Sequence, residues 1–288
     1  MTEPETSREV PTGDLSQWIG RRRVTEDRID PQPTRFMQQT LDREPTLGEG
    51  DALPPAWHWL YFIDGARISE TGRDGHAMRG GFLPPVSLPR RMWAGSRLEF
   101  HQPLRLGDAI SRDSVIRGIQ EKSGRSGPLC FVTVSHTYRR GDEVLLDEEH
   151  DIVYREDPAP GSGPPSPPPA ETRSDVRRTV DPSPLLLFRY SALTFNGHRI
   201  HYDIDYCRDV EGYPGLVFHG PLTATLLLDL LTDEAGQENI RNFRFRAMSP
   251  LFADRPFTMH LVKDEDVCRL WVADPDGGLA ARAEADIT

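Results

Sequence analysis

Long strand-like segments joined by tight turns are the feature that most restricts the fold of this chain. Turn signals such as Arg140-Gly-Asp and Ser123-Gly-Arg-Ser-Gly separate the segments. Strands connected by such short turns pair antiparallel, because parallel strands need a long crossover. We therefore predict an antiparallel sheet in the first half of the chain, preceded by a capped helix at 30–41. The expected strands are 96–102, 109–119, 129–139 and 144–154.

The second half of the chain repeats this outline. Phe100-His-Gln-Pro-Leu resembles Ala247-Met-Ser-Pro-Leu, each before an acidic turn. Further along, Cys130-Phe-Val-Thr-Val resembles Cys268-Arg-Leu-Trp-Val, and Glu149-His-Asp-Ile resembles Glu284-Ala-Asp-Ile. The three matches occur in one order, so they indicate a duplicated α+β unit. We expect two antiparallel sheets, each wrapping a central helix, packed as a pseudo-dimer within one chain.

Length and local composition suggest how the chain is divided. Its 288 residues and 37% apolar content are adequate for two ordinary cores. Proline and glycine dominate 157–170, as in a semi-rigid linker. We predict a disordered tail at 1–14, an N-terminal domain at 15–156, a linker at 157–180 and a catalytic C-terminal domain at 181–288.

Charge and cysteine content restrict partners and location. A net charge of −11 argues against binding to nucleic acid or to an anionic membrane surface. The three cysteines are widely spaced, and none forms a Cys-x-x-Cys pair, so neither a disulfide framework nor a zinc site is expected. The first residues are polar and acidic, and no apolar run is long enough to span a bilayer. These features favour a cytoplasmic protein.

One segment concentrates side chains that can move protons. Residues 190–203 read Tyr-Ser-Ala-Leu-Thr-Phe-Asn-Gly-His-Arg-Ile-His-Tyr-Asp, directly after an apolar run. A second segment, 212–221, leads into 222–231, which reads as a buried helix with Pro221 in its first turn. The free amides at such a helix start suit a substrate oxygen that becomes anionic during reaction.

The segment 190–203 resembles the hydratase motif of the MaoC-like, hot-dog-fold hydratases and dehydratases of acyl thioesters. Its variant is most similar to the mesaconyl-C4-CoA and itaconyl-CoA hydratases and the mitochondrial 3-hydroxyacyl-thioester dehydratases. The resemblance implies a double hot-dog fold with a degenerate N-terminal half, an acyl-CoA substrate, no cofactor and a homodimer. It places His201 on the catalytic histidine and Asn196 on a position that is usually aspartate. An amide cannot transfer a proton, so His201 is expected to move protons while Asn196 holds the water.

Several residues of this segment have two possible roles. Asn196 with Gly197 is also a common tight-turn pair, and Arg199 is expected either to pair with Asp203 or to bind CoA phosphates. Whether Asp203 or Asp205 serves as a second acid is open, and for His198 a structural role is favoured. No metal is expected, because His201 and His219 lack neighbours at ligand spacing. The candidate substrate-binding residues are Tyr190, Arg199, Phe218, His219 and Gly220.

The loop at 72–85 is a second candidate site. It holds Arg73, His76 and Arg79 among glycines and prolines, and it is expected either to bind an anion or to be a solvated surface loop. With Arg90 and Arg91 these arginines lie in the half expected to shape the acyl pocket. One of them is a candidate partner for a second carboxylate of the substrate.

The leading hypothesis is therefore reversible hydration of a branched, dicarboxylic enoyl-CoA such as mesaconyl-C4-CoA or itaconyl-CoA. One alternative is 3-hydroxyacyl-thioester dehydration in fatty-acid or polyketide synthesis. Another is a non-catalytic acyl-CoA-binding subunit, in which Asn196 at the usual aspartate position reflects the loss of catalytic activity.

Overall fold

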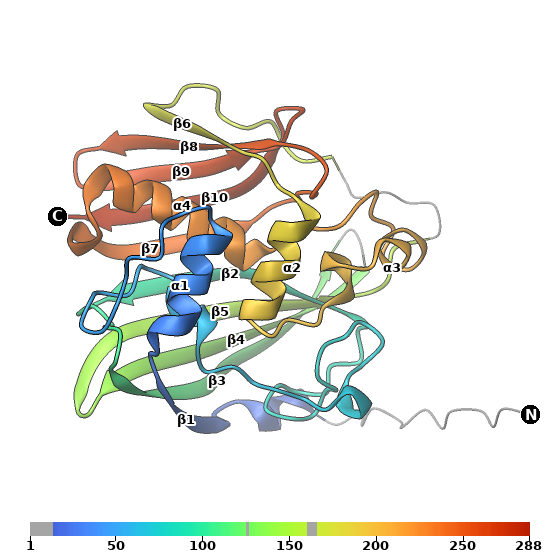
Figure 1. Ribbon diagram of the computed structural model, residues 1–288. Helices are drawn as coiled ribbons and strands as arrows, with labels where there is room; N and C mark the ends of the chain where they lie inside the picture. Colours follow the sequence, from blue (N-terminus) through green and yellow to red (C-terminus); the bar gives the residue numbers. More distant parts are fainter. Residues whose placement is uncertain (1–13, 125–126, 160–165) are drawn as a thin grey trace, which may run out of the picture.

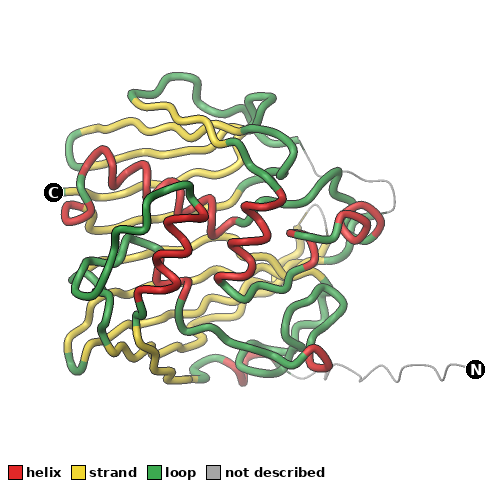
Figure 2. The backbone as a smooth tube through the Cα atoms, in the orientation of Figure 1, coloured by secondary structure: helices red, strands yellow, loops and turns green. Residues whose placement is uncertain are grey.

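A single antiparallel sheet of ten strands carries the helices on one face (Figures 1 and 2). The computed structural model describes residues 14–124, 127–159 and 166–288, so nearly all of the predicted tail at 1–14 lies outside the described residues. The strands are β1 (Arg22–Arg28), β2 (Arg90–Phe100), β3 (Ala109–Gly124), β4 (Gly127–Arg140), β5 (Glu143–Arg155), β6 (Val176–Val180), β7 (Ile240–Ala247), β8 (Phe257–Asp264), β9 (Val267–Ala273) and β10 (Leu279–Ile287). The helices are α1 (Pro31–Thr40), α2 (Pro184–Leu193), α3 (Ile204–Asp209) and α4 (Gly220–Ala235), with short 3-10 helices η1 (Leu15–Trp18), η2 (Trp57–Leu60), η3 (Ile68–Glu70), η4 (Arg199–His201) and η5 (Gln237–Asn239).

The strand order repeats itself, as the sequence matches indicate. The N-terminal half runs β1-β3-β4-β5-β2, and the C-terminal half runs β6-β8-β9-β10-β7 from its own outer edge. The three sequence matches fall at the ends of β2 and β7, within β4 and β9, and within β5 and β10. The predicted strands of the first half and the predicted helix at 30–41 are confirmed, with β2 beginning earlier than expected.

The two expected sheets are joined into one, which differs from the prediction. β2 pairs antiparallel with β7, so the halves share an uninterrupted hydrogen-bond ladder from Gly95↔Arg246 to Glu99↔Asn242. Gly95 permits the approach, because a Cβ at this position would lie 2.3 Å from the carbonyl oxygen of Phe245. Local patterns predict strands but not which edges meet, so this junction was not predictable from periodicity.

The central helix is also present only once in the described residues. α4 packs on β7, β8, β9, β10 and β2, and nine of its residues are buried. Apolar side chains lie on nearly all faces of α4, which is typical of a buried helix. In the N-terminal half the described chain between α1 and β2 contains only η2 and η3. The expectation of two central helices is therefore wrong for that half.

The predicted linker at 157–180 is shorter than expected. Its last residues form β6, which pairs with β8 at the edge of the sheet, while 160–165 lie outside the described residues. The strand alternates intermediate and exposed positions and contains Arg177 and Arg178, so its apolar signal is weak. None of the described helices is sufficiently long and apolar to cross a membrane.

Candidate active site

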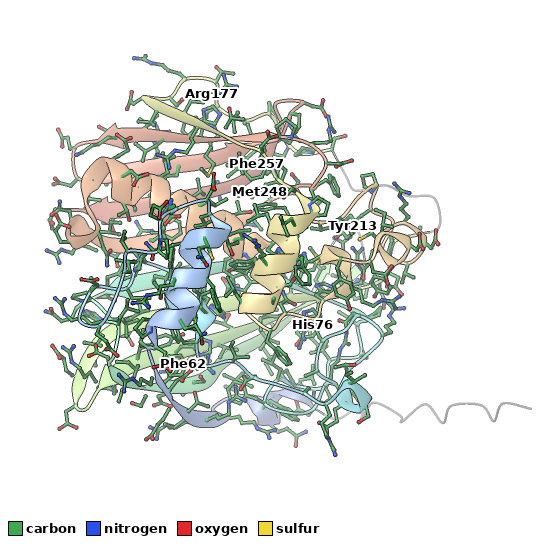
Figure 3. The ribbon with its side chains drawn as sticks, in the orientation of Figure 1. Phe62, His76, Arg177, Tyr213, Met248 and Phe257 are labelled. Carbon is green, nitrogen blue, oxygen red and sulfur yellow. The ribbon has the colours of Figure 1, made fainter. Side chains whose placement is uncertain are left out.

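A cavity of about 1810 Å³ extends across the helix-bearing side of both halves. Four residues labelled in Figure 3 line it and mark its extent: Phe62 and His76 from the N-terminal half, Tyr213 and Met248 from the C-terminal half. Its wall includes Tyr190 of α2, Asn196, His201, Phe218 and Gly220, so most of the predicted site residues face one space.

His201 lies at the end of η4 and is 7% exposed. Its Nδ1–H donates to the carbonyl oxygen of Val217 at 2.7 Å, and since a carbonyl can only accept, Nδ1 carries the proton. Nε2 is then the atom with a free lone pair. Burial lowers the pKa of His201 to about 4, so its imidazole is neutral at neutral pH and able to accept a proton.

Asn196 occupies a turn that leads from α2 to η4. Its Oδ1 accepts the backbone N–H of His198 at 3.0 Å, and its own N–H donates to the carbonyl oxygen of Ser191 at 2.8 Å. Asn196 is thus the turn residue that one interpretation expected, and it also lines the cavity, as its expected contact with water requires. With Oδ1 engaged, its Nδ2 amide is the group available to water or substrate.

The start of α4 meets the cavity at Gly220. The N–H of Gly220 has no hydrogen-bond acceptor among the described residues. A Cβ at this glycine would lie 3.1 Å from Cε3 of Trp93, so the small residue lets β2 pack against the helix start. This exposed amide at the positive end of a sixteen-residue helix is suited to bind a developing oxyanion.

His219 is not a cavity residue, contrary to the prediction. It is 0% exposed, its ring stacks on that of His201 at 3.6 Å between centroids, and one ring nitrogen, Nε2, lies 2.9 Å from Ser191 Oγ. Burial and the neighbouring histidines lower its pKa well below the usual range. His219 therefore supports the His201 ring from behind.

Arg199 and the two aspartates considered as acids also lie outside the cavity wall. The Arg199 guanidinium binds Asp203 Oδ2 through Nε and Nη2, at 3.0 and 2.7 Å. Asp203 in turn caps α3 by accepting the N–H of Tyr206 at 3.0 Å. Pairing with Asp203 is thus observed for Arg199, and neither Asp203 nor Asp205 is placed to exchange a proton with the substrate.

The loop at 72–85 is brought against the turn that carries Asn196 and leads to His201, which the sequence did not reveal. The carbonyl oxygen of Asp74 accepts the N–H of Arg199 at 2.9 Å. Gly75 has φ +85°, and a Cβ there would lie 1.9 Å from the carbonyl oxygen of Gly197. His76 of this loop lines the cavity. The prediction of a solvated surface loop is therefore wrong for the residues at its centre.

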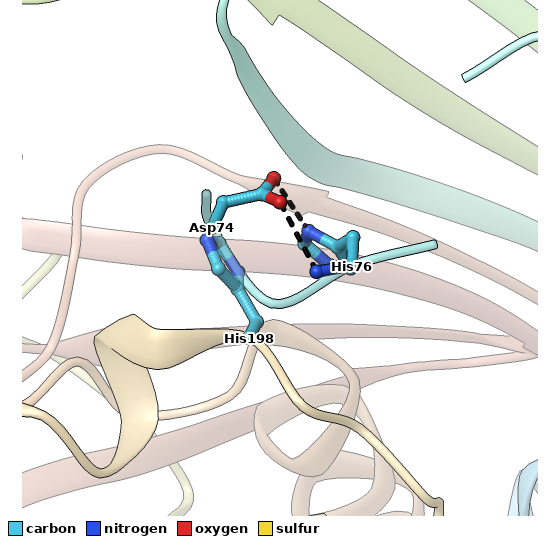
Figure 4. A group of neighbouring side chains, drawn as sticks. All are labelled: Asp74, His76 and His198. Atoms are coloured by element: carbon cyan, nitrogen blue, oxygen red, sulfur yellow. Dashed lines mark hydrogen bonds and ion pairs between the residues drawn. The ribbon is translucent and has the colours of Figure 1, made fainter. Parts of the chain in front are cut away.

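The same loop contributes to the one cluster with metal-ligand character among the described residues. The donor atoms of Asp74, His76 and His198 lie within 4.8 Å of one another, as shown in Figure 4. Carboxylate and imidazole are ligands that zinc and other transition metals accept. Sequence spacing did not show this cluster, because His198 is far from the other two along the chain.

A buried carboxylate in the N-terminal half escaped the sequence reasoning altogether. Glu148 of β5 is 2% exposed and accepts hydrogen bonds from side chains of η2 and of three strands. Burial opposes its charge, but the hydrogen-bonding histidines hold its pKa well below the usual value. The donors are His58, Trp59, Ser96, Tyr138 and His150, at 2.6 to 3.0 Å.

Known proteins resemble the chain over nearly its whole length. The sequence model of hydroxyacyl-thioester dehydratase type 2 matches residues 56–253. The mesaconyl-C4-CoA hydratase of Chloroflexus aurantiacus is 46% identical over 282 residues, covering 96% of this chain and 99% of the relative. A MaoC-like dehydratase structure from Phytophthora capsici matches with a TM-score of 0.71 at 12% identity, covering 96% and 98% of the two chains. A Mycobacterium tuberculosis protein described as a double hot-dog matches with a TM-score of 0.53 at 14% identity, covering 96% and 99%.

Proposed function

The chain belongs to the hydroxyacyl-thioester dehydratase type 2 family, and on that premise we propose that this hydro-lyase hydrates mesaconyl-C4-CoA. The hydration of an acyl thioester follows from the family, and the choice of acyl group rests on two supports. One is the 46% identity to a mesaconyl-C4-CoA hydratase over nearly the whole chain. The other is a cation in the cavity that fits the second carboxylate of this substrate.

That cation is Arg91, the single observation that carries the substrate assignment. Of the four arginines considered from the sequence, Arg73 pairs with Asp157, Arg90 pairs with Glu211, and Arg79 donates to backbone carbonyls of the segment before β2. Arg91 lines the cavity and has no carboxylate partner among the described residues.

The position of Arg91 relative to the histidines supports the same assignment. Burial lowers the pKa of both His76 and His198, and the positive charge of Arg91 adds to this lowering, so Arg91 lies in the same part of the cavity as the turn that carries Asn196. A half-buried guanidinium without a carboxylate partner attracts a carboxylate and can bind it through two N–H groups. A monocarboxylic enoyl group such as crotonyl offers nothing to satisfy it.

The chemistry assigned to the site follows from the free atoms of its residues. His201 Nε2 accepts a proton from water as the oxygen bonds to the β-carbon, and Asn196 Nδ2 orients that water. Electrons move to the thioester oxygen, where the N–H of Gly220 stabilises the negative charge, worth about 3 kcal/mol by analogy with known oxyanion sites. Return of a proton to the α-carbon completes the addition. Tyr190 and Phe218 form the apolar wall beside these groups.

The test is a comparison of kcat/KM for mesaconyl-C4-CoA, itaconyl-CoA, crotonyl-CoA and a long-chain enoyl-CoA. We expect the dicarboxylic substrates to be preferred, and Arg91→Gln to reduce the mesaconyl-to-crotonyl ratio at least ~10-fold, the effect of one lost charged contact. Arg97→Gln is the matched control, since Arg97 of the same strand lies outside the cavity wall and pairs with Glu149 and Asp151, and it should leave the ratio unchanged. Preference for crotonyl-CoA or for long chains in the unmodified protein would overturn the proposal.

A further inference from the structure

The replacement of the usual aspartate by Asn196 leaves the catalytic turn without a carboxylate. His201 is held by a backbone carbonyl, and Asp203 and Asp205 lie outside the cavity wall. Hydration nevertheless involves two proton movements, one away from water and one onto the α-carbon. If a second group carries a proton in this site, it comes from another part of the chain.

The N-terminal half brings such a group to the site. Asp74 accepts two hydrogen bonds from His76, from the backbone N–H at 3.0 Å and from Nδ1–H at 2.9 Å (Figure 4). Since a carboxylate only accepts, Nδ1 carries the proton and Nε2 is left free. The ring of His76 lies 4.2 Å from that of His198, which lies 5.4 Å from that of His201, all centroid to centroid.

The placement of the pair is fixed by the backbone. The Asp74 carbonyl oxygen accepts the N–H of Arg199, and the Arg73 carbonyl oxygen accepts a guanidinium N–H of the same residue at 3.2 Å. Gly75 fits against Gly197 with no room for a side chain. The pair is thus held against the turn that carries Asn196, and His76 lines the cavity while Asp74 lies behind it.

We propose that His76 is a second catalytic acid–base residue of this enzyme, and that Asp74 is the positioning residue which supplies the carboxylate missing at position 196. The proposal rests on the hydratase activity of the chain. In hydration, His201 accepts a proton from water as the carbon–oxygen bond forms. The His76 imidazolium then donates its proton to the α-carbon as the enolate returns its electron pair. After the product leaves, the proton on His201 is transferred through solvent to His76, so the protein is restored.

The surroundings of the two histidines separate their roles. The groups that face His76 are Asp74, His198, His201, Arg79 and Arg91. Burial and the two arginines lower the pKa of His76, whereas the Asp74 carboxylate raises it. His201 has no carboxylate partner, and burial lowers its pKa to about 4. The pKa of His76 is lowered overall as well, but only His76 has a carboxylate partner that favours its imidazolium, and this difference in partners suits an acid and a base in one site.

A metal ion on Asp74, His76 and His198 is the competing reading. Three observations disfavour it. The Asp74 carboxylate is already bonded to His76 Nδ1–H, and the positive charge of Arg91 lies in the same part of the cavity. Ligand atoms up to 4.8 Å apart would also have to move closer, because two ligands ~2.1 Å from one ion can be at most ~4.2 Å apart.

The decisive experiment measures the pH dependence of kcat/KM for Asp74→Asn and His76→Gln. The amide in Asp74→Asn keeps an oxygen for the His76 N–H groups but removes the charge. The His76 pKa then falls, so the alkaline limb of the profile should move to lower pH, with at least ~10-fold lost at pH 8. His76→Gln should lower kcat at least ~100-fold with a smaller change in KM.

Asn196→Asp tests whether a carboxylate on the turn can take over. Introduced into His76→Gln, it should restore part of kcat, which a merely structural loss would not allow. His101→Gln and Asp147→Asn are the matched controls, since these residues form the same kind of pair at 3.0 Å outside the cavity, and they should leave the profile unchanged.

Two results would overturn the proposal. One is an Asp74→Asn profile identical to that of the unmodified enzyme, whether or not His76→Gln folds. The other is loss of activity on chelation with recovery on adding Zn²⁺, which would assign the cluster to a metal. Either result leaves the hydratase function intact, whereas absence of turnover with every enoyl thioester in the unmodified enzyme would contradict that function itself.

Discussion

The two halves of the sheet have the same strand order, but the interior of one half is apolar and that of the other is polar. In the C-terminal half, α4 covers the sheet with an apolar surface, and its Leu222, Leu227, Leu228, Leu230 and Leu231 are fully buried. In the N-terminal half the corresponding position has only η2, a buried Glu148 with five donors, and much of the cavity. A duplicated fold thus gains its pocket where one copy lacks the helix, and the copy that keeps the helix supplies the proposed oxyanion site.

The catalytic side of this comparison predicts the largest effect. His201→Ala should lower kcat at least ~100-fold, because it removes the proposed general base. The fold should stay intact, because only one side chain at the cavity wall is shortened. His260→Ala is the control, a similarly buried histidine on β8 that packs on Trp271 away from the cavity. Steady-state kinetics and thermal unfolding of both variants provide the measurement. An unchanged rate in His201→Ala would mean that another residue is the base.

The polar interior of the N-terminal half predicts the largest loss of stability. Glu148→Gln places an NH₂ among five donors and should lower the free energy of unfolding by about 3–5 kcal/mol. Glu149→Gln is the neighbouring control, where a half-exposed pair with Arg97 should cost less than about 1 kcal/mol. Urea unfolding of both variants tests this, and equal losses would show that the buried network is not a stabilising feature.

The apolar interior predicts a contrast between two truncations. Leu228→Ala in α4 leaves a cavity in a close-packed region and should cost about 2–5 kcal/mol. Ile152→Ala on β5 enlarges a space that already exists, so only the transfer free energy of the removed atoms is lost, about 1–2 kcal/mol. If Ile152→Ala costs more than Leu228→Ala in chemical unfolding, the N-terminal interior is closed in solution and the comparison fails.

The contact between the halves predicts a smaller, pH-dependent effect. Asp229 of α4 pairs with Arg43 of the N-terminal half at 3.1 Å, yet burial raises its pKa to about 6 from the usual 3.8. The folded state therefore holds a proton that the unfolded state releases, and the contribution to stability is present below about pH 4 and lost as pH rises through about 6. Asp229→Asn should remove this dependence and raise stability by up to about 2 kcal/mol at pH 7. A wild-type stability that increases between pH 4 and 6, relative to the Asn variant, would show that Arg43 dominates.

The local signals were sufficient for most elements and for part of the site. Alternation and turn residues predicted β3, β4 and β5, and the apolar run with Pro221 predicted α4, because these elements depend on residues close in sequence. His201, Asn196 and Gly220 could be predicted as site residues for the same reason, since a short motif and a helix start contain them. They line one cavity in the structure.

The remaining features were missed because they join distant segments. Glu148 looked like any charged strand residue until η2 and three strands placed donors around it. For Arg199, pairing with Asp203 and binding of CoA phosphates were both open, and only the structure shows the pair with Asp203; His219 lies behind the His201 ring instead of on the cavity wall. Arg91 stood out among four arginines only once the partners of the other three were known.

The sequence by itself determined the elements and their duplication, because hydrophobic period and turn chemistry are local properties of a chain, and its motif predicted which residues would move protons. Tertiary structure alone decided that the halves join through β2 and β7, that only the C-terminal half has a central helix among the described residues, and that Asp74 and His76 reach the turn of Asn196. These contacts join segments that are far apart in the sequence. Backbone approach and packing select the partners, so no local sequence pattern predicts them.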